Sequence, residues 1–325
     1  MTTARVVLMP GQGAQFVGMG KVWAEKSAEA KRVFDEADAI LEGKLPGGAK
    51  LSELCWNGPA EVLNRTDVSQ PAIYTAGVAC WRGMLAQMGI GAQAGVKEAG
   101  VVSTAGLSLG EYTALHVAGA FSFEDGLRLV ALRGAAMQEA AEKSVGGMVA
   151  LIGADEAQAK QVCAEALAGG SAGEVLVCAN FNAPGQIVIS GSKSACDRAA
   201  AADGPAAKLG LRATALQVAG AFHSPLMAPA AEKLRAALQT TKIGALSCEV
   251  FANVTAQAHA GDAESIRTRL FEQLTAPVRW AESCAAMAKQ YSSAEFHELA
   301  PGKTLMGLMR RIEKSVKVIT HDEPA

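Results

Sequence analysis

Two segments of the chain match the pattern Gly-x-Ser-x-Gly, which can hold a serine nucleophile. One runs from Gly106 to Gly110 and contains Ser108, and the other runs from Gly169 to Gly173 and contains Ser171. Between a strand and a helix, this pattern places the serine on a tight turn with its hydroxyl exposed beside backbone N–H groups. A chain with 34 glycines produces such matches by chance, so the flanking segments must distinguish the two.

The flanking segments favour Ser108. The run of small residues from Val101 to Ala105 predicts a buried strand, and the segment from Glu111 to Ala120 predicts a helix with an acidic first turn. Around Ser171 the order is reversed, because a predicted helix precedes it and a predicted strand follows, so its glycines are typical of a helix stop and a loop. We therefore expect Ser108 to be the nucleophile and Ser171 to lie in a structural turn.

A serine hydroxyl needs a neighbouring base to take its proton, and the chain has five histidines. His116 lies two turns along the helix that Ser108 opens, too far to reach back. His223 stands in a glycine-bounded turn at 220–225, at the seam between two regions of different element order, where clefts are common. A buried histidine with a purely structural role is the alternative there. The others lie in loops, in the tail or on a possible strand: His259, His297 and His321.

Composition and charge set broad limits. A chain of 325 residues with 50% hydrophobic and 19% charged residues predicts a soluble, globular protein with a large core, and we expect a main domain with a smaller one. A net charge of -2 and the lack of a basic run argue against nucleic acid as a partner. The seven cysteines form no CxxC pair and no zinc-like cluster, which predicts buried thiols in a reducing, cytoplasmic setting.

Neither a targeting segment nor a membrane helix is expected. A strand predicted from Arg5 leaves no room for a signal peptide before it. The apolar stretches are interrupted well before the length of about 20 residues that a membrane-spanning helix needs.

The order of the predicted elements indicates an α/β fold with an insert. Up to about residue 140, short apolar runs alternate with helical patterns, which is typical of a layered α/β domain. From Gly146 the order becomes strand 148–152, helix 155–167, strands 175–179 and 186–190, helix 193–202 and strand 213–218. This βαββαβ order predicts a ferredoxin-like subdomain.

After Ala219 the alternation of short apolar runs and helical patterns returns. We expect a helix at 229–239, a strand near Val250, two more helices and a final strand at 316–319. The predicted domains are therefore a large α/β domain at 1–144 and 214–325 and a small ferredoxin-like subdomain at 145–213.

Several motifs, in order from Pro10 to about Arg311, resemble one family. They are Pro10–Gln15, Gly106–Tyr112, Arg133–Gly134 with Met137–Gln138, Asn180–Gln186, Gly220–Pro225 and Gln273–Trp280. Together they resemble the malonyl-CoA:acyl carrier protein transacylases, over nearly the whole chain. The resemblance implies a hydrolase-like parallel-sheet core with an inserted ferredoxin-like subdomain. It also implies ping-pong transfer of a malonyl group from malonyl-CoA to the phosphopantetheine thiol of acyl carrier protein, through a seryl ester and with no metal or redox cofactor. The product would supply fatty-acid or polyketide chain extension.

The resemblance assigns roles residue by residue. Ser108 would be the nucleophile and His223 the general base and then acid, held by a backbone carbonyl near Gln273 rather than by an acidic residue. The backbone N–H groups of Gln12 and Leu109 would form the oxyanion hole. The remaining assignments are the malonyl carboxylate ligand Arg133, the malonyl-type residue Phe222, and the supporting residues Gln273, Asn180 and Asn182.

Each assignment has a plainer alternative. Gln12, Gln15 and Gln273 can be ordinary loop or surface amides, the two asparagines can be turn formers, and Arg133 can pair with Glu139. The basic cluster in the last helix, which is a solvated face or a docking patch for an acidic carrier, consists of Arg310, Arg311, Lys314 and Lys317.

One departure and two rival functions remain. Many relatives carry histidine before the nucleophile, where this chain has Leu107, so no adjacent imidazole can replace His223 as the base. A thioesterase or esterase would use the same serine and histidine but deliver the acyl group to water. A non-catalytic module that binds the carrier would keep the scaffold and form no acyl-enzyme.

Overall fold

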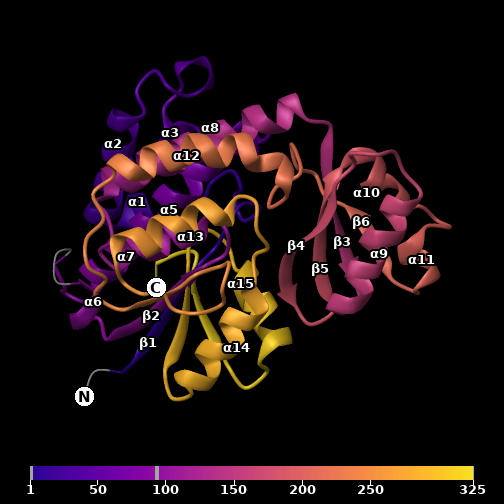
Figure 1. The fold of residues 1–325 in the computed structure, drawn as a ribbon. Coiled ribbons are helices and arrows are strands. Elements are labelled where there is room, and N and C mark those ends of the chain that lie inside the picture. The colour runs from indigo at the N-terminus through magenta and orange to yellow at the C-terminus, as the bar shows by residue number, and fades with distance from the viewer. Residues whose placement is uncertain (1–2, 92–94, 325) are drawn as a thin grey trace.

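The computed structural model describes residues 3–91 and 95–324 and contains two separate β-sheets (Figure 1). The larger sheet has five parallel strands in the order β7-β2-β1-β8-β9. Its strands are β1 (Arg5–Met9), β2 (Val101–Gly106), β7 (Glu249–Phe251), β8 (Glu295–Leu299) and β9 (Val318–His321). The carboxyl ends of parallel strands share one edge, where α/β folds gather their functional residues.

Both faces of the parallel sheet are covered. Side chains of β1 alternate between two cores: Val7 and Met9 join the larger one, and Val6 and Leu8 join the one that contains Trp280. Such burial on both sides is the usual state of a parallel sheet.

Most helices contribute to the larger core, and two contribute to the other. Those of the larger core are α1 (Lys21–Lys26), α2 (Ala28–Ile40), α3 (Leu51–Asn57), α4 (Ala60–Leu63), α5 (Thr66–Gln87), α6 (Gly95–Glu98), α7 (Gly110–Val117), α8 (Phe123–Lys143), α12 (Ala228–Thr240) and α13 (Ala263–Gln273). Those of the other core are α14 (Trp280–Gln290) and α15 (Thr304–Ile312), and short 3₁₀ turns occur at η1 (Pro46–Gly48) and η2 (Pro225–Met227).

The second sheet forms the smaller part at the right of Figure 1 and is antiparallel, in the order β4-β5-β3-β6. Its elements are β3 (Gly146–Ile152), α9 (Glu156–Ala168), β4 (Leu176–Ala183), β5 (Gln186–Ser192), α10 (Lys193–Ala200), α11 (Pro205–Lys208) and β6 (Arg212–Ala215). The predicted fold class, a parallel core with a separate βαββαβ unit, is confirmed. The domain limits at 144/145 and 213/214 stay a prediction, and the second of them falls inside β6.

The C-terminal third differs from the expected order. The sequence predicted two helices and one strand after β7, whereas the structure has three helices and the additional strand β8. The segment Glu-Phe-His-Glu-Leu of β8 lacks a continuous apolar run, so its strand character comes from pairing with β1 and β9 on either side. The final strand begins at Val318 rather than Val316, because the backbone N–H of Val316 donates to Glu313 O in a turn.

The turn between β2 and α7 is as tight as the sequence predicted. Ser108 has a φ of 51°, in the left-handed region. A Cβ at Gly106 would lie 1.8 Å from the carbonyl carbon of Gly110, and a Cβ at Gly110 would lie 2.2 Å from Met9 O. Glycine is therefore required on both sides of the serine, because backbone occupies the space of a side chain. Ser171 lies exposed in the loop between α9 and β4, as expected.

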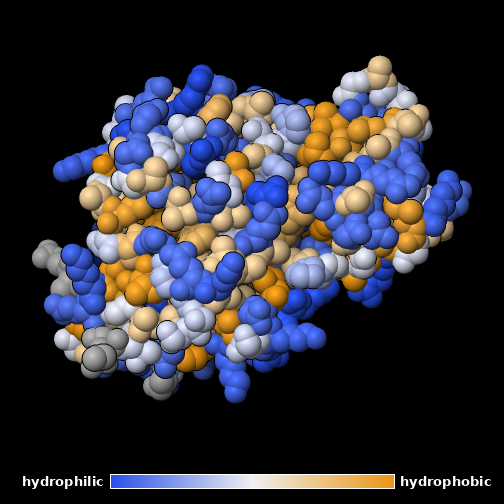
Figure 2. Space-filling model, turned by 60° about the horizontal axis from the view of Figure 1, so that its bottom comes forward, coloured by the Kyte–Doolittle hydropathy of each residue, from blue (hydrophilic) through white to orange (hydrophobic). Residues whose placement is uncertain are grey.

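The surface and the thiols agree with the composition. In Figure 2, hydrophilic residues cover much of both parts of the molecule on the face shown. Among residues 3–91 and 95–324, no helix has the length and apolar character to cross a membrane. All seven cysteines are free thiols, and all except the half-buried Cys248 are buried.

We predict that Gly106→Ala destabilises the protein by about 3 kcal/mol or more, because its methyl group overlaps the backbone of the turn. The matched control is Gly307→Ala in α15, where a Cβ meets no atom within 4 Å. That control should stabilise the protein by about 0.5–1 kcal/mol, since alanine is the better helix former. Urea unfolding of both variants checks the pair, and equal midpoints would contradict the packing argument.

Candidate active site

Ser108 and His223 lie in direct contact although 115 residues separate them. The Ser108 Oγ is 2.8 Å from His223 Nε2. On the other side of the ring, Nδ1 is 2.8 Å from the backbone oxygen of Gln273. A carbonyl only accepts, so Nδ1 carries the proton and Nε2 is left as the acceptor for the serine hydroxyl. The structure thus places an imidazole base beside the exposed serine of a tight turn.

The surroundings of His223 keep its imidazole neutral. The side chain sits on the loop between β6 and η2, with a φ of 55° and an exposure of 3%. Burial, together with the nearby charge of Arg133, lowers the pKa of His223 to about 4, although the hydrogen bond to the backbone of Gln273 raises it in part. A histidine with this pKa is ready to accept a proton at neutral pH.

Arg133 of α8 points inward and is 1% exposed. One terminal nitrogen donates to Ser108 Oγ and to Gln273 Oε1, both at 3.0 Å, and the other donates to Gln70 Oε1 at 2.7 Å. Its guanidinium also lies 5.5 Å from the ring centre of Tyr112. In the part of the chain that the structure describes, the Arg133 Nε has no hydrogen-bond partner. The guanidinium therefore faces the serine with unused donor capacity.

The alternative pairing of Arg133 with Glu139 is not what the structure contains. Glu139 lies on the outer face of the same helix and bonds Lys143 at 2.7 Å and also Lys233. These lysines lower the pKa of the Glu139 carboxyl to about 2.

The backbone of Ser108 is held from both sides by two amide side chains. Gln273 Nε2 donates to Ser108 O at 3.0 Å, and the N–H of Ser108 donates to Asn253 Oδ1 at 2.6 Å. Asn253 also donates to Gly106 O at 2.7 Å. Sequence reasoning missed Asn253, although it closely follows β7, at the edge of the sheet where functional residues gather.

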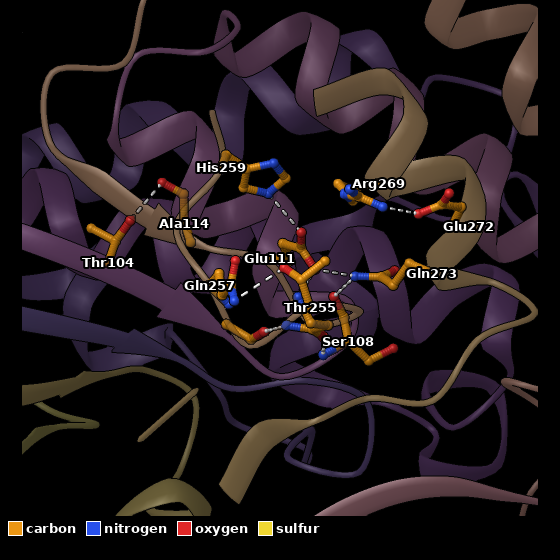
Figure 3. A network of polar contacts seen from close by, with 12 residues as sticks. Thr104, Ser108, Glu111, Ala114, Thr255, Gln257, His259, Arg269, Glu272 and Gln273 are labelled. Carbon is orange, nitrogen blue, oxygen red and sulfur yellow. Dashed lines mark hydrogen bonds and ion pairs between the residues drawn. The ribbon is translucent and has the colours of Figure 1, made fainter. Parts of the chain in front are cut away.

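Behind the serine lies a buried acid that sequence reasoning treated as an ordinary first-turn residue. Glu111 is 0% exposed, and its Oε1 lies 2.9 Å from His259 Nε2 (Figure 3). The other oxygen accepts from Gln273 Nε2 at 2.6 Å and from the N–H of Asn253 at 3.1 Å. No local signal could pair these groups, because Glu111 and His259 are 148 residues apart.

A pocket of about 180 Å³ opens over the pair of Ser108 and His223. Its lining brings together four of the other predicted site residues, Gln12, Asn180, Asn182 and Phe222, and also contains Gln15 and Leu107. Within residues 3–91 and 95–324, the buried Asn182 Oδ1 has no hydrogen-bond partner.

Gln12 is held at the floor of this pocket by its side chain. Its amide nitrogen donates to Thr66 Oγ1 at 3.3 Å, and its amide oxygen accepts from Gln70 Nε2 at 3.4 Å. These bonds hold the loop that follows β1, and the loop lies against the turn before Ser108, because a Cβ at Gly11 would lie 2.1 Å from Leu107 O. Leu109 begins the first turn of α7 and is fully buried.

The remaining candidates lie elsewhere. His116 Nδ1 contacts Phe121 O at 3.0 Å, and His297 and His321 contact each other at 2.9 Å on β8 and β9. All four residues of the basic cluster, in α15 and the loop after it, are exposed, and one of them, Arg311, bonds Gln186 Oε1 at 2.8 Å and Pro184 O at 3.1 Å.

The arrangement can carry an acyl group on a serine. A neutral base takes the proton of Ser108, and a buried guanidinium stands beside the nucleophile to bind an anionic group of the acyl chain. Among the described residues, no acidic side chain bonds His223, whose orientation comes from the backbone carbonyl of Gln273.

Comparisons with known proteins agree with this chemistry. A family model described as acyl transferase domain matches residues 6–321. The malonyl CoA-acyl carrier protein transacylase of Bacillus subtilis (strain 168) is 40% identical over 320 residues, which cover 98% of this chain and 93% of the relative.

Solved structures give the same picture. A malonyl-CoA:acyl carrier protein transacylase from Xanthomonas oryzae pv. oryzae superimposes with a TM-score of 0.87 at 41% identity, covering 100% of this chain and 96% of its own. A malonyl-transacylase solved in complex with its type II PKS acyl-carrier protein has a TM-score of 0.88 at 35% identity, with coverages of 99% and 97%. With a matching sequence over nearly its whole length and the same fold, the chain belongs to the malonyl CoA-acyl carrier protein transacylase family of acyl transferase domains.

Proposed function

We propose that this acyltransferase moves a malonyl group from malonyl-CoA to the phosphopantetheine thiol of acyl carrier protein through an ester on Ser108. The observation that carries the proposal is the Arg133 guanidinium, which is buried and lies 3.0 Å from Ser108 Oγ. Within the part of the chain that the structure describes, it has no carboxylate partner. The names of the relatives support the same substrates.

The malonyl carboxylate would complete the site. A buried cation bonded only to neutral groups is costly, and a carboxylate bound by two N–H groups of its planar fork offsets that cost. An acetyl group has no carboxylate, so it leaves the buried charge of Arg133 without an anionic partner. The pocket would therefore favour an acyl chain that ends in a carboxylate, with the thioester carbon over Ser108.

The transfer would proceed in two half-reactions that share one histidine. Ser108 Oγ attacks the thioester carbon while its proton passes to His223 Nε2, and the same proton leaves with the sulfur of CoA. In the second half, the carrier thiol gives its proton to His223 and attacks the seryl ester. Cleavage of the ester returns the proton to Ser108.

The negative charge that develops on the acyl oxygen would be met by backbone donors. We assign this role to the N–H groups of Gln12 and Leu109, the first on the loop held by Thr66 and Gln70 and the second at the amino end of α7. One donor of this kind contributes about 3 kcal/mol in related reactions.

Every group in this scheme belongs to the chain or to its two substrates. The thiols arrive on CoA and on the carrier, and the acid–base work is done by His223, so the proposal needs no metal or redox cofactor. Malonyl-loaded carrier is the product that chain extension in fatty-acid or polyketide synthesis consumes.

Ser108→Ala should abolish the malonyl adduct, whereas Ser171→Ala should leave transfer within about twofold of wild type, because only Ser108 has the nucleophile turn. Intact mass after incubation with malonyl-CoA, followed by addition of acyl carrier protein, measures both half-reactions. Release of free malonate in place of loaded carrier would instead support a thioesterase.

Arg133→Ala should lower malonyl transfer by at least about 10²-fold and improve acetyl transfer relative to malonyl, because the carboxylate loses its bidentate partner. Arg133→Lys should recover little, since an ammonium keeps the charge and loses the planar fork. The measurement is the rate of adduct formation with malonyl-CoA and acetyl-CoA. Unchanged selectivity in both variants would remove Arg133 from the substrate site.

The pH profile should report the depressed pKa of His223. Because the base acts in its neutral form, kcat/KM should hold from about pH 8 downward and decline only near pH 4, well below the ordinary histidine value of 6.5. Arg133→Gln removes a positive charge, so it should raise this pKa and shift the acid limb to higher pH. Acetyl-CoA serves as the substrate for both proteins, with circular dichroism to confirm that they stay folded. A wild-type limb near pH 6.5 would contradict the assignment.

A further inference from the structure

The charge of Arg133 is balanced by Glu111, which it reaches through an intervening amide and not by direct contact. Its hydrogen bonds within residues 3–91 and 95–324 all go to uncharged oxygens, on Gln70, Ser108 and Gln273. The Gln273 amide that accepts from Arg133 through Oε1 donates through Nε2 to the carboxylate of Glu111 at 2.6 Å. A chain of two hydrogen bonds thus joins a buried cation to a buried anion.

Glu111 is built into the protein interior as a hydrogen-bond acceptor. Its carboxylate is 0% exposed and receives three donors: His259 Nε2, Gln273 Nε2 and the backbone N–H of Asn253. Figure 3 shows Glu111 between His259 on one side and Gln273 on the other. It does not touch Ser108 Oγ or the pocket, so any influence on the reaction passes through its partners.

The carboxylate of Glu111 and the backbone oxygen of Ser108 both accept from Gln273 Nε2, and together they set which way the Gln273 amide faces. An ionised carboxylate only accepts, so the NH₂ group of Gln273 turns toward Glu111 and its oxygen turns toward Arg133. In the opposite orientation, the NH₂ group would meet the guanidinium, donor against donor. The orientation that these two acceptors set is therefore the one that holds Arg133 beside Ser108.

His259 secures the other carboxylate oxygen. Its Nε2 lies 2.9 Å from Oε1, and both side chains are almost wholly buried, at 0% and 1% exposure. A buried carboxylate without such partners costs several kcal/mol, so this contact helps to hold Glu111 in place.

We propose that Glu111 is a positioning residue for malonyl selectivity, which fixes Arg133 through the Gln273 amide. The inference rests on the proposed malonyl transfer and adds a residue behind the site that sets its preference for an anionic acyl group.

The test is the variant Glu111→Gln. The rates of adduct formation with malonyl-CoA and with acetyl-CoA are measured and divided by the fraction of active sites that can form an adduct. The amide has one acceptor oxygen, whereas the carboxylate has two, so at least one of the three donors loses its acceptor. The amide is also uncharged, so Arg133 loses its counter-charge. We expect the malonyl rate to fall on the order of tenfold or more and the acetyl rate by less than about threefold. If Glu111 had a purely structural role, the substitution would lower the thermal midpoint and the fraction of active sites that form an adduct. The ratio of the malonyl rate to the acetyl rate would then stay at its wild-type value.

Gln273→Met provides a second variant that leaves Glu111 intact. It removes the connecting amide but keeps the backbone oxygen that holds His223. If the influence passes through this amide, Gln273→Met should reduce the malonyl-to-acetyl ratio at least as far, and adding Glu111→Gln should lower it no further. Additive losses in the double variant would overturn the route through Gln273.

The matched control is Glu298→Gln on β8. Glu298 is also 0% exposed, and its carboxylate accepts from the N–H groups of Leu305 and Met306 at 2.7 Å, outside the site. The variant Glu298→Gln should change the stability of the protein without changing the ratio of the malonyl rate to the acetyl rate. A wild-type ratio in Glu111→Gln would overturn the inference, whereas absence of a malonyl adduct on the wild-type enzyme would overturn the proposed function instead.

Discussion

The left-handed backbone of Ser108 is the constraint around which the site is arranged. Holding a non-glycine residue there costs on the order of 1–3 kcal/mol, and the structure offsets this cost with hydrogen bonds to both sides of the residue. Asn253 accepts from its N–H, and Gln273 donates to its carbonyl. The close approach of Gly106 and Gly110 then brings β2 and α7 together at the turn. An exposed hydroxyl at the amino end of a helix is the result.

The antiparallel sheet takes part in this arrangement as well as forming one wall of the pocket. The backbone of β4 bonds the segment after α13 twice, through Phe181 N to Val278 O at 2.9 Å and Val278 N to Ala179 O at 2.8 Å. That segment begins just after Gln273, whose carbonyl orients His223. The small sheet therefore helps to fix the base as well as the substrate pocket, although it contributes neither member of the Ser–His pair.

The electrostatics of the site follow from burial. A desolvated imidazole beside a guanidinium stays neutral, which suits a base, while the guanidinium keeps its charge because arginine does not deprotonate in proteins. Glu111 supplies the opposite charge from behind the amide of Gln273, out of the pocket. Separation of the two charges by an amide leaves Arg133 available to a ligand, whereas a direct ion pair would occupy its fork.

Local pattern in the sequence determined the elements and the nucleophile. The strand, the Gly-x-Ser-x-Gly turn and the helix are consecutive, so sequence alone distinguishes Ser108 from Ser171, and the βαββαβ order indicated the second sheet. Comparison of the five histidines favoured His223 as the base of Ser108, and the resemblance to a family added Arg133 and the carbonyl of Gln273. Only the tertiary structure decided what those groups touch. Asn253, His259 and the burial of Glu111 left no local signal, because their hydrogen bonds join segments more than a hundred residues apart. Strand β8 was left as one alternative for the segment around His297, since its mixed residues become a strand only between β1 and β9.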